Sequence, residues 1–72
     1  MKPAINQIRI FNGSTNENFR YTYFIVISYK KEWNDEFWIC RRLHPSCGIL
    51  RFTMQDIMTI SNYVSEKTGK NR

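Results

Sequence analysis

The chain has 72 residues and carries 11 Lys and Arg against 6 Asp and Glu, which gives a formal net charge of +5. A chain this short buries only about 60% of the surface that its unfolded form exposes, so we expect one domain over residues 1–72. Hydrophobic residues make up 42% of the chain, which excludes the composition of a disordered protein.

The sequence has no run of the roughly 18 apolar residues that a membrane helix needs, so we expect no membrane partner and a cytoplasmic location. The excess of basic residues favours a polyanion or an acidic protein surface as the partner.

Two strands are predicted in the first half of the chain. Residues 6–11 alternate around Ile8 and Ile10, and a run of turn-forming residues follows at 12–18. Residues 19–31 are dense in aromatic and β-branched side chains and contain neither Gly nor Pro, which predicts the longest strand. The odd positions of this strand are the more apolar, so we expect them to face the core.

Residues 32–36 predict a hairpin connection to a third strand at residues 37–43. We expect Glu32 to pair with Glu36, because this register places Phe37 and Ile39 on the apolar side of the second strand. A slip of one residue would instead bring Arg42 opposite Ile27 on that side.

A turn at residues 44–48 leads to a short strand at residues 49–52. Thr53 is a suitable N-cap, and a helix is predicted over residues 54–67 from the spacing of Ile57, Ile60, Tyr63 and Val64. The expected fold is therefore α+β: a small antiparallel β-meander of three to four strands with one C-terminal α-helix packed on one face. The other face of the sheet is expected to be open.

Catalytic and metal-binding patterns are weak. Cys40, His44 and Cys47 have ligand chemistry, but a structural zinc site takes four ligands and His44 is the only histidine. A Cys40–Cys47 disulfide is sterically feasible, and a reducing cytosol disfavours it. No Gly-rich phosphate loop is present. We expect no cofactor, no metal and no enzymatic activity.

The even positions of the strands are expected to form a basic and aromatic surface on the open face. Such a surface can hold phosphates while its rings contact bases, and the layout is similar to the sheet-reading DNA-binding domains of some integrases and plant transcription factors. We therefore expect nucleic-acid binding, to DNA in preference to RNA. The expected contact residues are Arg20, Phe24, Lys30, Trp38, Arg42 and Arg51.

The same composition suits a protein partner, because interface cores are enriched in aromatic residues and Arg. The alternative function is a small inhibitor or adaptor that binds another protein through this face or through the helix. A third interpretation is that a second copy of the chain, in a homodimer, or the N-terminal segment covers the exposed aromatic residues.

Overall fold

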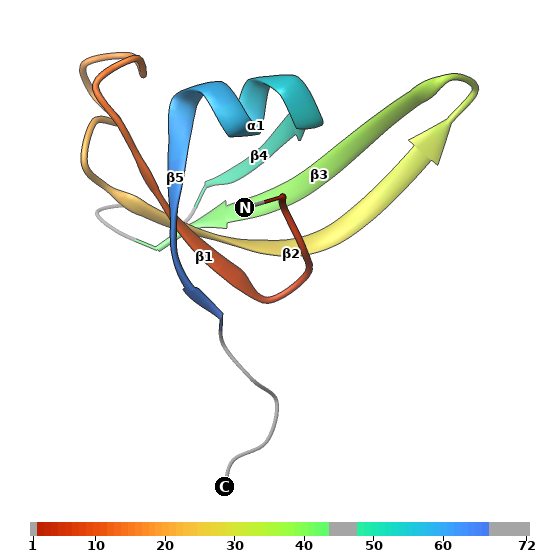
Figure 1. The fold of residues 1–72 in the computed structure, drawn as a ribbon, viewed down its shortest axis with the longest axis horizontal. Helices are drawn as coiled ribbons and strands as arrows, with labels where there is room; N and C mark the ends of the chain where they lie inside the picture. Colours follow the sequence, from red (N-terminus) through yellow and green to blue (C-terminus); the bar gives the residue numbers. More distant parts are fainter. Residues whose placement is uncertain (1, 44–47, 67–72) are drawn as a thin grey trace, which may run out of the picture.

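The computed structural model describes residues 2–43 and 48–66. Within these residues the chain forms five strands and one short helix (Figure 1). They follow one another as β1 (Gln7–Phe11), β2 (Tyr23–Glu32), β3 (Asp35–Arg42), β4 (Ile49–Thr53), α1 (Met54–Ile60) and β5 (Ser61–Glu66). All strand pairs are antiparallel and the order across the sheet is β4-β3-β2-β1-β5. The α+β class and the antiparallel sheet are confirmed, with five strands rather than three to four.

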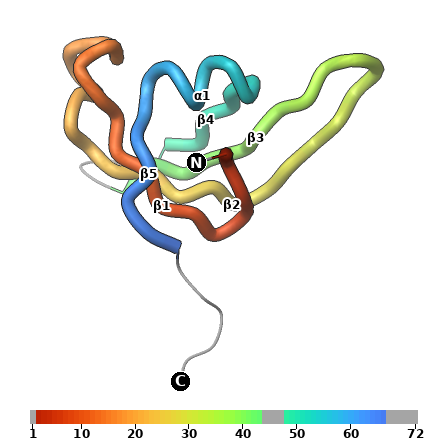
Figure 2. The backbone as a smooth tube through the Cα atoms, viewed as in Figure 1, coloured from red at the N-terminus to blue at the C-terminus, as the bar shows by residue number. Residues whose placement is uncertain are grey.

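The sheet curls around its own core. β1 and β4 are separated by two strands, and a flat sheet with a spacing of about 4.8 Å per strand would hold them roughly 14 Å apart. The ring centroids of Phe11 in β1 and Phe52 in β4 are nevertheless only 6.1 Å apart. The two ends of the sheet therefore bend toward each other, and α1 lies between them (Figures 1 and 2).

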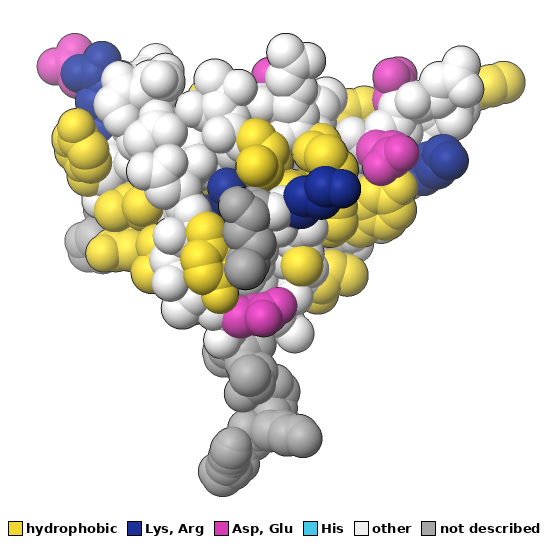
Figure 3. All heavy atoms as spheres, viewed as in Figure 1, with side chains coloured by type: hydrophobic (Ala, Val, Ile, Leu, Met, Phe, Trp, Pro, Cys, Tyr) yellow, Lys and Arg dark blue, Asp and Glu magenta, His cyan; other side chains and the backbone are white. Residues whose placement is uncertain are grey.

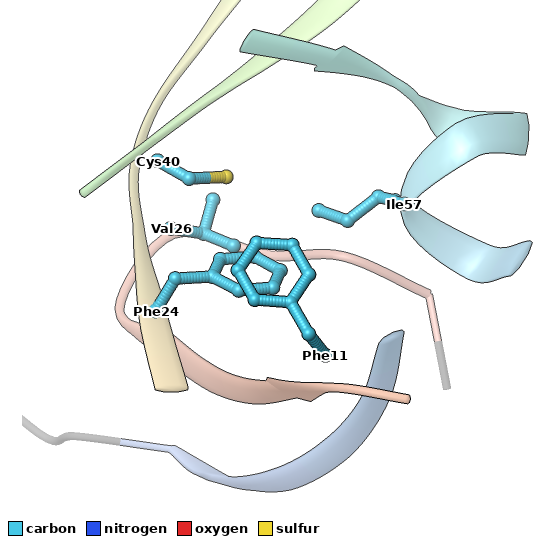
Figure 4. Close-up of a cluster of buried hydrophobic side chains, with 5 residues drawn as sticks. All are labelled: Phe11, Phe24, Val26, Cys40 and Ile57. Carbon is cyan, nitrogen blue, oxygen red and sulfur yellow. The ribbon is translucent and has the colours of Figure 1, made fainter. Parts of the chain in front are cut away.

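The core lies inside this curl. Its centre is formed by one buried residue of the helix and four buried residues of the first three strands: Phe11, Phe24, Val26, Cys40 and Ile57 (Figure 4). Phe11 and Phe24 pack with ring centroids 4.6 Å apart. α1 contributes Ile57 to this cluster, so it closes the inner side of the sheet.

The helix begins where the sequence predicts and ends earlier. The hydroxyl of Thr53 accepts a hydrogen bond of 3.2 Å from the backbone N–H of Asp56, which confirms Thr53 as the N-cap. The helix ends at Ile60, whose carbonyl accepts hydrogen bonds from the backbone N–H of Asn12 (2.8 Å) and the hydroxyl of Thr15 (2.8 Å). The loop after β1 thus binds the carbonyl end of the helix.

Residues 61–66 are therefore a strand and not the continuation of the helix. Ser61 already has an extended backbone, with φ −144° and ψ 161°. The predicted helix over 54–67 is wrong in its second half, because β5 pairs with the open edge of β1. Tyr63 and Val64 belong to this strand, and both β-branched and aromatic residues suit it.

The β2–β3 hairpin is tighter than predicted. Glu32 pairs with Asp35, and Trp33 and Asn34 form a two-residue turn. Trp33 has a φ of 56°, and the first position of a two-residue hairpin turn with positive φ is usually occupied by Gly. The hairpin extends away from the rest of the chain (Figure 2).

A β-bulge in β2 reverses the predicted faces of the inner half of this strand. Near the turn, Tyr29 pairs with Trp38, so an odd residue lies opposite an even one. The register then shifts between Val26 and Ser28, and beyond this point Val26 pairs with Cys40. The even positions of the inner half of β2 consequently point into the core, where the sequence pattern predicted the odd positions.

Candidate nucleic-acid interface

The sheet presents a solvent-facing surface on β2, β3 and β4 that we call the outer face. Cys40 points into the core, so its neighbours along β3 point outward. The register pairs Ile39 with Arg51, Arg41 with Ile49 and Lys30 with Phe37, which places these side chains on the same side of the sheet. Over these strands the outer face carries Lys30, Phe37, Ile39, Arg41, Ile49 and Arg51, and Glu32 and Asp35 lie on the same side at the end of the β2–β3 hairpin.

Arg51 is positioned on the outer face by an aromatic ring. The centre of its guanidinium group lies 4.5 Å from the centroid of the Phe37 ring, a cation–π contact across β3 and β4. A guanidinium held over a ring keeps its edge N–H groups directed to solvent. Ile49 lies beside this pair with 60% of its surface exposed.

Basic groups dominate the outer face over β3 and β4. Arg41 and Arg51 are both exposed. In the described part of the chain neither of them lies within ion-pair distance of a carboxylate. Lys30, closer to the hairpin turn, has its Nζ 3.2 Å from a carboxylate oxygen of Glu32. The positive charge that is available to a ligand therefore lies mainly on Arg41 and Arg51.

Three of the six predicted contact residues lie in or against the core instead. Phe24 is fully buried, and Arg42, its partner across β2 and β3, is buried with its guanidinium 4.2 Å from the centroid of Phe19. Trp38 is half-buried and packs on Tyr29 with ring centroids 4.7 Å apart. The prediction that these side chains lie on an open face is wrong. The two-residue turn places the even positions of β3 on the inner side, and the bulge places the even positions of β2 beyond it on the same side.

The other three predicted residues are exposed, and two of them lie together. Lys30 and Arg51 are both on the outer face. Arg20 lies in the loop between β1 and β2, and its Nε donates a hydrogen bond of 3.1 Å to the carbonyl of Thr15. Arg20 therefore belongs to a different part of the surface.

The structure adds four outer-face residues that the sequence did not single out: Phe37, Ile39, Arg41 and Ile49. The consecutive pair Arg41-Arg42 could have indicated Arg41 as a second candidate. Adjacent residues of a strand point to opposite sides, so only one of the two arginines can share a face with Trp38. Which of the two arginines is exposed depends on which side of β3 faces the core, and Cys40 shows that it is the side of the even positions.

Residues 2–43 and 48–66 provide no candidate site for metal binding or catalysis. No group of three His, Cys, Asp or Glu side chains in these ranges is close enough to hold a metal ion, and no cavity of ligand size is present there. Cys40 is a free, buried thiol. Two members of the cluster considered from the sequence, His44 and Cys47, lie outside the described residues. No helix in the described ranges has the length and apolar character to cross a membrane.

Comparison of the chain with protein-family models, with curated proteins and with solved structures gives no match. The outer face therefore has to be interpreted from its own chemistry.

Proposed function

We propose that the chain is a non-enzymatic DNA-binding module that uses the outer face of its sheet. The observation that carries this proposal is the Arg51 guanidinium over the Phe37 ring, 4.5 Å from its centroid, beside the exposed Arg41. Guanidinium groups bind phosphate oxygens through paired N–H donors, and an aromatic support reduces the freedom that the side chain loses on binding.

The spacing of the two arginines supports the same interpretation. Arg41 pairs with Ile49 and Arg51 pairs with Ile39, so the two arginines are diagonal neighbours on adjacent strands. Diagonal neighbours in an antiparallel pair are about 7–8 Å apart, a distance that lets two long side chains contact different phosphates of one strand.

Duplex DNA is the proposed form of nucleic acid. The major groove of B-form DNA admits a two-stranded β-ribbon, whereas the deep and narrow major groove of an RNA helix does not. Strands β3 and β4, which pair at one edge of the sheet and carry Arg41 and Arg51, are the proposed ribbon (Figure 1).

The test is fluorescence anisotropy of a labelled DNA duplex across a salt series. We expect affinity to fall as salt rises, because each phosphate contact contributes a slope of about −0.9 in log K against log salt. The double variant Arg41→Gln/Arg51→Gln should bind more weakly and lower the slope by about 2. Lys31→Gln is the control for a single charge: Lys31 is exposed, follows Lys30 in β2 and points to the opposite side of the hairpin.

Two results would reject DNA binding through this face. One is the absence of binding at low salt. The other is binding by the double variant that matches that of the unmodified protein. Equal losses from Arg41→Gln and Lys31→Gln would indicate a general effect of charge without a specific face.

A second candidate function rests on the exposure of Ile49, which at 60% is large for an apolar side chain between two arginines. A protein partner with an acidic surface and an apolar centre would cover it, as a target of a small inhibitor or adaptor would do. Pull-down from lysate treated with nuclease separates the two functions, because a DNA-binding protein loses its co-purifying material and a protein-binding one keeps it.

A further inference from the structure

The end of the β2–β3 hairpin exposes an aromatic side chain that the fold does not need. Trp33 is 95% exposed and has a φ of 56°, a conformation that bulky side chains rarely adopt. Gly or Asn would make the same turn with less strain. A residue that is unfavourable for the fold and fully accessible points to a contact outside the chain.

Charge is distributed unevenly along this hairpin. Three of the six acidic residues of the basic chain lie at its end: Glu32, Asp35 and Glu36. Acidic side chains are visible along this projection in Figure 3. A phosphate backbone is repelled by such a group of carboxylates, so the end of the hairpin is unsuited to DNA.

The outer side of β3 carries opposite charges at its two ends. Asp35, Phe37, Ile39 and Arg41 alternate with inward residues and therefore lie on one side of the strand. Asp35 and Arg41 are separated by about 20 Å at roughly 3.3 Å per residue. Between them lie the two half-buried apolar side chains Phe37 and Ile39.

The outer side of β3 is acidic at one end, apolar in the middle and basic at the other end, so it is complementary to a second copy of itself that runs in the opposite direction. If a second copy lies antiparallel on the outer face, Asp35 of each copy meets Arg41 of the other, and the apolar centres meet between them. Trp33, next to the acidic end, then lies over Arg41 and Ile49 of the second copy. The contact removes an exposed ring and an exposed Ile from water and adds a cation–π pair.

We propose that two copies of the chain pair through their outer faces in a two-fold, antiparallel dimer, with Trp33 of each copy against the Arg41 end of the other. A two-fold interface of this kind uses the same surface on both copies and closes after two subunits. The proposal does not rest on DNA binding. Dimer formation would nevertheless affect DNA binding, because the dimer covers Arg41 and Arg51 and therefore competes with DNA.

Sedimentation velocity over a concentration series tests the proposal on protein that has been treated with nuclease and washed in high salt. We expect a monomer–dimer equilibrium that shifts toward monomer as salt rises. Tryptophan fluorescence reports the contact separately: Trp38 is already half-buried, so a shift to shorter wavelength as the dimer forms is expected to come from Trp33 and to be absent in Trp33→Gly. Trp33→Gly should also weaken the dimer.

Charge reversal gives the sharpest outcome. Asp35→Arg alone and Arg41→Asp alone each place like charges at both ends of the interface, so each variant should be monomeric. An equimolar mixture of the two variants brings opposite charges together at both ends and should restore the dimer. Lys31→Glu is the matched control on the opposite side of the hairpin, and it should dimerise as the unmodified chain does.

Three results would overturn the dimer. They are a monomer at every concentration, a mixture that remains monomeric although both variants show an unchanged circular dichroism spectrum, and open-ended assembly beyond two copies. Because no DNA is present, none of these results depends on whether the outer face binds DNA.

Discussion

The Nε atom of Arg9 donates a hydrogen bond of 2.8 Å to the Oγ of Ser61, and both side chains are 1% exposed. A second guanidinium nitrogen donates to the Ser61 carbonyl at 3.3 Å, and a third donates to the Oε1 of Gln7 at 2.7 Å. Burial lowers the pKa of Arg9, and the nearby Cys40 opposes this shift. The arginine joins β1 to the point where α1 ends and β5 begins.

This connection makes Arg9 a structural residue. We expect Arg9→Lys to lower the free energy of unfolding by about 2–3 kcal/mol. The single ammonium group of Lys cannot make the hydrogen bonds that the three guanidinium nitrogens of Arg9 donate to separate acceptors. Urea unfolding followed by circular dichroism measures the change. Arg20→Lys, at an exposed arginine, should stay within about 0.5 kcal/mol of the unmodified chain. Equal effects of the two substitutions would mean that the buried hydrogen bonds contribute little.

Phe24 was predicted from the sequence to contact nucleic acid, and in the structure it lies in the core. Because Phe24 is fully buried against Phe11, we expect Phe24→Ala to cost about 3–5 kcal/mol of stability. Phe24→Leu should be milder and should bind DNA with an unchanged salt slope. A Phe24→Ala protein of normal stability with reduced DNA affinity would instead place this ring on the binding surface.

Cys40 should make the protein less stable in alkali. Burial raises the pKa of its thiol to about 12, and Arg9 lowers it by a smaller amount. The pKa of the folded state thus exceeds the unfolded value of about 8.5, so the stabilising contribution is complete below that pH and is lost as pH rises toward the folded pKa.

Two measurements check this behaviour. In a Cys47→Ser background, Cys40 should react with iodoacetamide slowly in the folded protein and rapidly in denaturant. The free energy of unfolding should also fall more steeply above pH 9 for this protein than for a version that carries Cys40→Ala. A thiol that is alkylated at the same rate in both conditions would contradict the burial of Cys40.

Trp33 should be replaceable without loss of stability. Gly removes the cost of a left-handed L-residue, roughly 1–2 kcal/mol, and adds about 0.5–1 kcal/mol of backbone entropy, so the thermal midpoint of Trp33→Gly should be equal or higher. Trp33→Val should be destabilised, because a β-branched residue tolerates positive φ poorly. A large loss of stability in Trp33→Gly would mean that the exposed ring supports the fold.

The positions of β1, β3 and β4 were readable from local sequence, because apolar and β-branched residues between turn signals are sufficient to define strands. The N-cap Thr53 was readable for the same reason, since its hydrogen bond to Asp56 is local. The end of α1 was not, because the groups that bind the Ile60 carbonyl come from Asn12 and Thr15, more than forty residues away.

The candidate site was predictable in kind and not in position. A basic and aromatic sheet surface follows from the composition of the strands, and Lys30 and Arg51 do lie on the outer face. The bulge at Ile27 and the two-residue turn at Trp33 set which neighbours join them, and neither leaves a clear mark in the sequence. Binding of DNA by these residues stays a prediction.

The pairing of β5 with β1 also sets the order of events during folding. The Arg9–Ser61 hydrogen bond within this pairing spans 52 residues, whereas the β2–β3 hairpin closes over two. A chain that emerges from the ribosome can form the hairpin early, but its interior stays open until residues 61–66 are available. Such distant contacts place the protein among domains that fold in milliseconds to seconds rather than microseconds.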